Sequence, residues 1–153
     1  MEKLNFDNGV KEYRINGTGI LRFNPGDPNL YARFLDALDG IKALEQELMG
    51  KAQAMEKADP AHSGEAVLRL MQESDRRIKA LLTQVFGSEN DFEQVLGGVN
   101  LLATAGNGQR VIANFLAALQ PVLEAGANTY VKEKTAAAVA QAKRSRAQRA
   151  GKE

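Results

Sequence analysis

Apolar residues recur at intervals of three, four or seven along residues 28–58, which places them on one face of a long helix. The stretch FNPGDPNLYARF explains where this helix begins. Pro25 and Gly26 end an extended segment, because proline cannot donate to a strand ladder. Asp27 then suits the helix N-cap and Pro28 its first turn. The sequence therefore predicts a strand-to-helix switch followed by a helix over 28–58.

Three more helices are predicted further along the chain. A second apolar stripe predicts a helix over 64–86, ended by Gly87, that packs antiparallel to the first. Ser88 and Asp91 resemble a capping box and predict a short helix over 89–96. The last helix is expected over 108–131, with Pro121 either kinking it or marking a boundary.

The N-terminal residues read as a small β-hairpin over 4–23. Asn-Gly pairs at residues 8–9 and 16–17 favour the positive φ angles of tight hairpin turns, so two or three short antiparallel strands are expected. A hairpin alone is marginal in water and must lean on other elements. We therefore predict a mainly α (α+β) fold, with the hairpin packed on a helical bundle in a single globular domain over 1–131.

Composition narrows the class of protein. At 153 residues the chain suits one domain, and the absence of cysteine excludes disulfides and thiolate metal sites. No segment has the apolar length of a secretory signal or a membrane span, which leads us to expect a cytoplasmic protein that makes no membrane contact.

The C-terminal residues 132–153 form a basic tail. They hold seven Lys or Arg against two Glu, a net charge of +5, whereas residues 1–131 hold 13 Lys or Arg against 17 Asp or Glu, a net charge of −4. The tail is rich in good helix formers with little to bury, so it is expected to be helical or disordered. Its central cations are candidates for electrostatic contact with a partner: Lys143, Arg144, Arg146 and Arg149.

The same cations could bind nucleic acid through phosphates. No aromatic residue lies among them to stack on bases, and the rest of the chain is acidic. Protein contact or simple solvation of the tail is therefore favoured over nucleic-acid binding, which stays an alternative.

Candidate chemistry is sparse. His62 is the single histidine and lies in a loop, so neither a zinc site nor a catalytic dyad is indicated. Carboxylate pairs on the long helix, such as Asp36 with Asp39, are typical of a solvated face. The glycine-rich pieces LGGVN and AGNGQR do not match a phosphate-binding loop and read as turns. We expect no catalytic, metal or cofactor residues, and no enzyme.

One apolar stripe on the first long helix has two interpretations. Its members are Phe34, Leu38, Ile41 and Leu48. The simpler interpretation is that they belong to the core. The alternative is an exposed apolar groove that binds a helix of a partner protein.

Three segments together carry a resemblance: YRINGTGILRFNPGDPNLYARF, LLTQVFGSENDFEQVLGGVNLL and GQRVIANFLAALQPVLEAG. They resemble a family of small phage and prophage tail proteins from Gram-positive hosts, similar to the tail assembly chaperones of long-tailed phages. The likeness covers most of the chain apart from residues 49–65 and the tail.

The resemblance implies a cytoplasmic, non-enzymatic protein that binds the long helical tape measure protein and helps to recruit the major tail protein during tail assembly. It assigns no binding residue to a single position. Two alternatives stay open: a structural subunit retained in the phage particle, and a nucleic-acid-binding protein that acts through the basic tail. A homo-oligomer is compatible with each of them.

Overall fold

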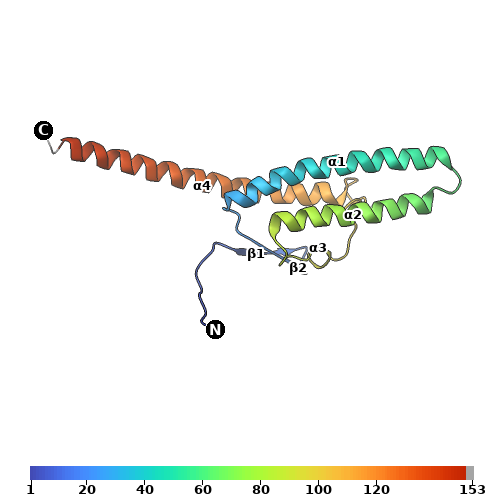
Figure 1. The fold of residues 1–153 in the computed structure, drawn as a ribbon, viewed down its shortest axis with the longest axis horizontal. Coiled ribbons are helices and arrows are strands. Elements are labelled where there is room, and N and C mark those ends of the chain that lie inside the picture. Colours follow the sequence, from blue (N-terminus) through green and yellow to red (C-terminus); the bar gives the residue numbers. More distant parts are fainter. Residues whose placement is uncertain (151–153) are drawn as a thin grey trace.

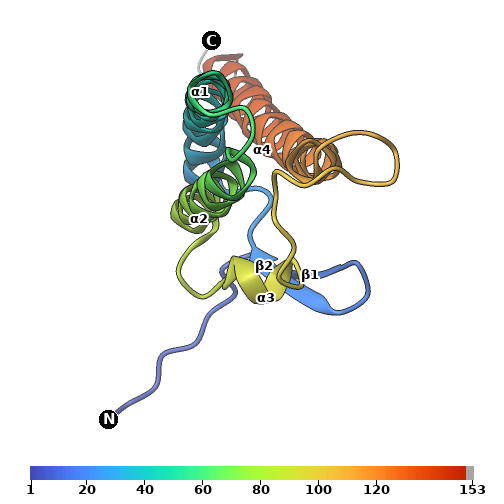
Figure 2. The ribbon, with the colours of Figure 1, turned by 90° about the vertical axis from the view of Figure 1, so that its right-hand side faces the viewer.

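The computed structural model describes the backbone of residues 1–150, and the side chains of that range except for 130–139, 141–143 and 145–150. Its elements are β1 (Lys11–Ile15), β2 (Gly19–Phe23), α1 (Pro28–Ala58), α2 (Gly64–Phe86), α3 (Phe92–Val95) and α4 (Val111–Ala150). In Figure 1, α1 and α2 run antiparallel, and α4 passes along α1 and continues beyond the body. Seen end-on in Figure 2, the hairpin and α3 lie beneath α2 and α4. The predicted fold class, mainly helical with an N-terminal hairpin, is confirmed.

The two long helices α1 and α2 have the predicted bounds. The α1 N-terminus also has the predicted cap, since a carboxylate oxygen of Asp27 accepts a hydrogen bond from the Asn29 backbone N–H at 2.9 Å. Gly87 ends α2 with a φ of 102°, a positive angle that glycine adopts without strain. Caps and periodicity, which are local signals, were sufficient to place both helices.

The hairpin is shorter than predicted. β1 and β2 pair antiparallel around the Asn16-Gly17 turn, whose φ angles of 49° and 83° are both positive as a type I′ turn requires. Residues 1–10, however, form no strand. The prediction that the hairpin begins at residue 4 is wrong, because Asp7 and Asn8 accept hydrogen bonds from the backbone N–H groups of Gly9 and Val10 instead of forming a hairpin turn.

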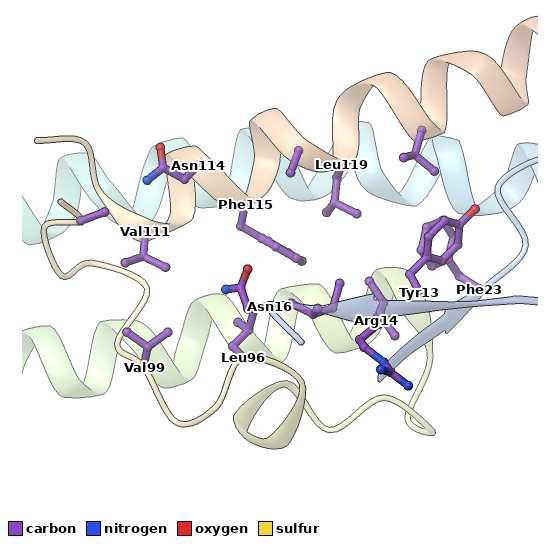
Figure 3. Close-up of a pocket in the computed structure, with 15 residues that line it drawn as sticks. Tyr13, Arg14, Asn16, Phe23, Leu96, Val99, Val111, Asn114, Phe115 and Leu119 are labelled. Carbon is purple, nitrogen blue, oxygen red and sulfur yellow. The ribbon is translucent and has the colours of Figure 1, made fainter. Parts of the chain in front are cut away.

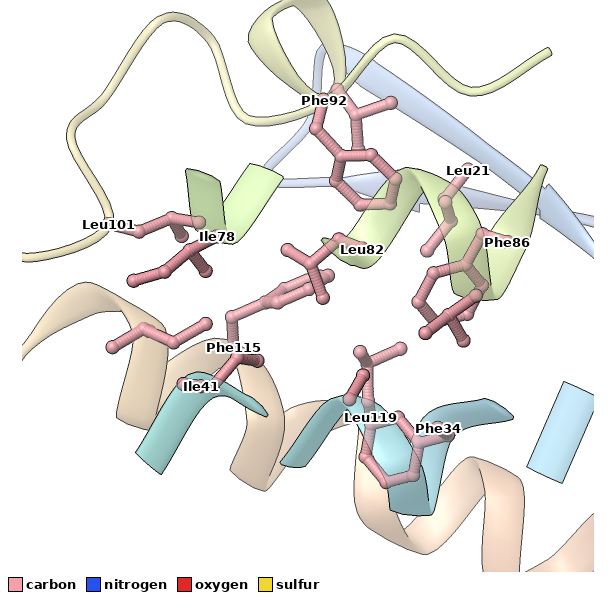
Figure 4. Packing of buried hydrophobic residues seen from close by; sticks show 14 of the residues in the cluster. Leu21, Phe34, Ile41, Ile78, Leu82, Phe86, Phe92, Leu101, Phe115 and Leu119 are labelled. Atoms are coloured by element: carbon pink, nitrogen blue, oxygen red, sulfur yellow. The ribbon is translucent and has the colours of Figure 1, made fainter. Parts of the chain in front are cut away.

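A chain of aromatic rings joins the hairpin to the helices. The rings of Tyr13 and Phe23 stack with centroids 4.7 Å apart, and Phe23 meets Phe86 of α2 edge-on at 5.1 Å. Phe86 contacts Phe92 of α3, whose ring lies 6.3 Å from that of Phe115 in α4. Such contacts each contribute about 0.5–1.5 kcal/mol beyond the area they bury. The hairpin and three helices therefore share one core (Figure 4).

The outer edge of β2 is covered by a side chain. Asn90 is 4% exposed, and its amide accepts a hydrogen bond from the Arg22 N–H at 2.8 Å and donates one to the Arg22 carbonyl at 2.9 Å. The same amide nitrogen donates to the Phe86 carbonyl near the end of α2. The Asn90 side chain thus makes the two hydrogen bonds that a neighbouring strand would make to Arg22, and it connects the hairpin to α2.

We expect Asn90→Ala to lower the free energy of unfolding by about 2–4 kcal/mol, because it leaves the part-buried backbone groups of Arg22 and the buried Phe86 carbonyl without this partner. Urea unfolding followed by circular dichroism measures the change. Asn5→Ala, at an exposed position outside the strands and helices, is the control and should have little effect. Equal stabilities of the two variants would contradict this role for Asn90.

The short helix begins later than predicted. Asp91, not Ser88, is its N-cap, and the Asp91 carboxylate accepts a hydrogen bond from the Glu93 N–H at 3.0 Å. The helix therefore covers Phe92–Val95 instead of residues 89–96. Residues 87–90 form a turn instead, closed by a hydrogen bond from the Asn90 N–H to the Gly87 carbonyl at 3.1 Å, and the Asn90 side chain holds this turn against β2.

The last helix is longer than the predicted 108–131. α4 begins at Val111 and continues to Ala150. Pro121 lies inside it and marks no boundary, since Leu119 and Leu123 on either side are 5% and 0% exposed and hold both segments on the core. The backbone of the tail is helical as far as residue 150, while residues 151–153 lie outside the described residues.

Candidate functional site

The apolar stripe on α1 belongs to the core. Phe34, Ile41 and Leu48 are between 3% and 5% exposed, and Leu38 is partly buried against the same cluster. Figure 4 shows Phe34 and Ile41 pointing in among side chains of α2 and α4. The alternative of an exposed groove along this face of α1 is therefore corrected, because α2 and α4 already cover it.

The basic residues of the tail lie on the part of α4 that projects from the body (Figure 1). Arg144 is exposed. The side chains of Lys143, Arg146 and Arg149 lie outside the described residues. The backbone nevertheless places all four on one helix, beyond the ends of α1 and α2.

A hollow of about 550 Å³ lies between the hairpin and α4, and we call it the hairpin groove (Figure 3). Tyr13 and Ile15 of β1 line one wall, and Phe115, Ala118 and Leu119 of α4 line the other. In Figure 3, Phe115 and Leu119 point from α4 toward the hairpin. The walls are mainly apolar, as is typical of sites that bind apolar side chains.

A second hollow continues the groove along α4. Its volume is about 640 Å³, and it shares Tyr13 and Val122 with the first. Gly9, Lys11 and Asn24 close this end. The groove therefore follows β1 from the base of the N-terminal arm to the hairpin turn.

The free edge of β1 borders this groove. Arg22 turns its N–H and carbonyl away from β1 toward Asn90, and it pairs directly opposite Glu12. When two residues lie opposite each other in an antiparallel pair, their backbone N–H and C=O groups either all point toward the other strand or all point away from it. The N–H and C=O of Glu12 therefore point outward, like those of Arg22. Arg14, two residues on, faces the same way. Within the described part of the chain, no hydrogen bond reaches these outward groups.

A buried ion network holds the loop after α3. The ammonium of Lys79, whose side chain is 7% exposed, lies 2.9 Å from a carboxylate oxygen of Asp75 and 2.8 Å from one of Glu93. It also donates to the Val99 carbonyl, and the other Asp75 oxygen accepts from the Leu101 N–H. With each charge paired and hydrogen-bonded, the network has a structural role.

The groups considered for chemistry are dispersed. His62 is exposed, and its Nδ1 lies 3.1 Å from a carboxylate oxygen of Asp59. Hydrogen bonds from Lys51 and then from Arg77 lower the pKa of the Glu47 carboxyl below its ordinary value, which makes it a poorer proton donor near neutral pH. In the part of the chain that the structure describes, no three metal-binding side chains gather. None of the described helices has the length and apolarity needed to span a membrane.

Sequence reasoning did not find the hairpin groove, because its walls come from segments about 100 residues apart. A weak signal was present. Tyr13 and Ile15 alternate along β1, which marks one face of the strand as apolar, but nothing local says what covers that face.

The class that the fold and surfaces define is a mainly helical protein with a groove beside an open strand edge and a projecting basic helix. No family model, curated protein or solved structure matches the chain.

Proposed function

We propose that the protein is a non-enzymatic phage tail assembly chaperone or tail accessory protein, which binds the tape measure protein and the major tail protein in the host cytoplasm. The resemblance of residues 13–34, 81–102 and 108–126 to small phage tail proteins suggests the class. Two surfaces support it: a mainly apolar groove beside the open edge of β1, and the part of α4 that projects from the body.

The observation that carries the proposal is the projecting half of α4. A single helix surrounded by water is marginal, because most helical stability in proteins comes from packing one face against a neighbour. In Figure 1 this part of α4 extends past the other helices. A partner helix that packs along it would supply the missing contacts, and the resemblance implies a long helical partner in the tape measure protein.

Charge supports the same surface. The tail carries a net charge of +5 beside a body of −4, so its cations attract an acidic face on a partner. This attraction raises the association rate and weakens as salt screens it.

The first experiment is a pull-down of the tagged protein from induced, lysing cells, with mass spectrometry of purified tails or particles from the same culture. Recovery of the tape measure protein, with this chain missing from the particles, is the expected result. Stoichiometric presence in the particles would instead make it a structural subunit. Loss of all captured material on nuclease treatment would favour the nucleic-acid alternative.

Neutralising the tail tests the surface itself. Replacing all four central cations by glutamine is expected to lower the recovery of the tape measure protein about tenfold, because a surface ion pair contributes a fraction of a kcal/mol. The four are Lys143, Arg144, Arg146 and Arg149.

The control replaces four exposed cations of the body by glutamine. They are Lys42, Lys57, Arg69 and Arg76. This control has the same change in net charge but leaves the tail intact, so recovery should stay near the wild-type level. An equal loss in both variants would show that net charge, not the tail, governs the binding.

A further inference from the structure

The N-terminal arm, residues 1–7, displays exposed apolar side chains. Leu4 is 89% exposed and Phe6 is 78% exposed. They are two residues apart, so an extended arm places both on the same face. In Figure 1 the arm runs away from the body and its end lies far from the helices.

The chain also holds a surface that fits such a segment. The hairpin groove has apolar walls, and the bordering edge of β1 presents unpaired backbone groups at Glu12 and Arg14. An extended segment that adds to an open strand edge gains main-chain hydrogen bonds, while its alternate side chains fill adjacent pockets. We propose that the arm of a second copy of this chain binds along β1 and places Leu4 and Phe6 in the hairpin groove.

Side-chain matching selects a parallel alignment with Glu2 beside Lys11. That register places Lys3 beside Glu12, so both charged pairs have opposite signs. Cross-strand pairs of opposite charge and apolar pairs both stabilise a sheet.

The same register brings the apolar residues together. Leu4 lies beside Tyr13 and Phe6 beside Ile15, on the face of β1 that lines the groove. The six residues from Glu2 to Asp7 span about 20 Å when extended, which is enough to follow a five-residue strand of about 17 Å.

Parallel alignment requires a second copy. Only residues 7–10 separate Phe6 from β1, whereas a parallel connection within one chain needs a dozen or more residues. The arm could pair with its own β1 only by folding back through a turn at Asn8-Gly9, which makes the two strands antiparallel. That antiparallel return would place Lys3 beside Arg14, a pair of like charges.

The base of the arm is also held in a conformation that does not form a hairpin. The Asn24 amide donates to the Asn8 carbonyl at 3.0 Å, and Asn8 lacks the positive φ that a tight hairpin turn needs. The arm is therefore presented outward to a neighbour. If two copies exchange arms reciprocally, they form a closed dimer. If each copy gives its arm to the next copy, they form an open-ended oligomer.

Self-association of the purified protein tests the proposed exchange of arms. No phage partner is present in this experiment, so its result does not depend on whether the proposed function is correct. We expect analytical ultracentrifugation to show a dimer or larger species for the wild type. The double variant Leu4→Asp and Phe6→Asp should weaken association at least about 100-fold, because two buried apolar side chains are lost. Both positions are exposed in the single chain, so its fold is retained.

Leu68→Asp is the matched control, since Leu68 is 67% exposed on α2 and far from β1 in sequence. It should leave self-association unchanged. A wild type that stays monomeric at all concentrations would overturn the proposal. So would an oligomer that the arm variant does not weaken.

Disulfide trapping tests the register, because the chain has no cysteine of its own. A mixture of the single variants Glu2→Cys and Lys11→Cys should form a disulfide-linked dimer under mild oxidation. The double variant Phe6→Cys with Lys11→Cys tests the antiparallel return, and it should form no bond within one chain. An internal bond there, with no linked dimer in the mixture, would show that the arm folds onto its own β1 and would overturn the exchange.

Discussion

Replacing Lys79 with alanine is expected to lower the free energy of unfolding by about 3–5 kcal/mol, the usual cost of leaving a buried charge without its partner. The Asp75 carboxylate is 8% exposed and has Lys79 as its cation at 2.9 Å. The substitution also removes the donor to the Val99 carbonyl, which helps to hold the loop that follows α3. Urea unfolding followed by circular dichroism measures the loss, with an unchanged slope indicating an intact native state.

Two comparison variants distinguish the cost of leaving a buried charge unpaired from the cost of shortening a lysine side chain. Lys51→Ala removes the same side chain from an exposed pair with Glu47 and should change stability little. The double variant Asp75→Asn with Lys79→Met removes both charges and keeps an acceptor for the Leu101 N–H, so it should recover at least half of the loss. If Lys79→Ala costs no more than Lys51→Ala, the network is not what holds this loop.

Gly126→Ala is expected to destabilise the protein by about 1–3 kcal/mol, the cost of overpacking. A β-carbon at residue 126 would overlap the backbone carbonyl of Pro25, so α4 and the strand-to-helix switch would have to move apart. Backbone atoms cannot yield as a flexible side chain does. The expected sign is the reverse of the usual one, since alanine is favoured over glycine by about 1 kcal/mol inside helices.

Gly50→Ala provides the matched control. Gly50 lies inside α1, and a β-carbon there meets no atom within 4 Å. It should raise the free energy of unfolding by about 0.5–1 kcal/mol in the same urea experiment. Stabilisation by both substitutions would mean that α4 does not rest on Pro25.

The close approach at Gly126 also gives the FNPGDPNLYARF segment a second role. Its letters predicted the end of β2 and the start of α1, and both are confirmed. They did not show that the same turn is the surface against which α4 packs, because Gly126 lies 101 residues beyond Pro25 and reads as an ordinary weak point in a helix. The turn therefore positions one wall of the hairpin groove as well as joining two elements.

Some predictions failed because a tertiary contact outweighed a local preference. Ser88 has good N-cap chemistry, yet it lies in a turn that Asn90 holds against Arg22 of β2, and the helix begins after Asp91. The pair Asn8-Gly9 favours a hairpin turn as strongly as Asn16-Gly17 does, yet only the second forms one. The first is instead held by Asn24 from the far end of the hairpin.

The sequence by itself determined the mainly helical class, the bounds of α1 and α2, the Asp27 cap and the turn between β1 and β2. Each depends on neighbours a few residues away, through helix periodicity, capping or the φ preference of glycine. Only the tertiary structure decided that the α1 stripe is core, that Lys79 is buried with Asp75, and that a groove separates β1 from α4. These features depend on which distant segments pack together. A residue is buried only when such segments cover it, and no local sequence pattern specifies that packing.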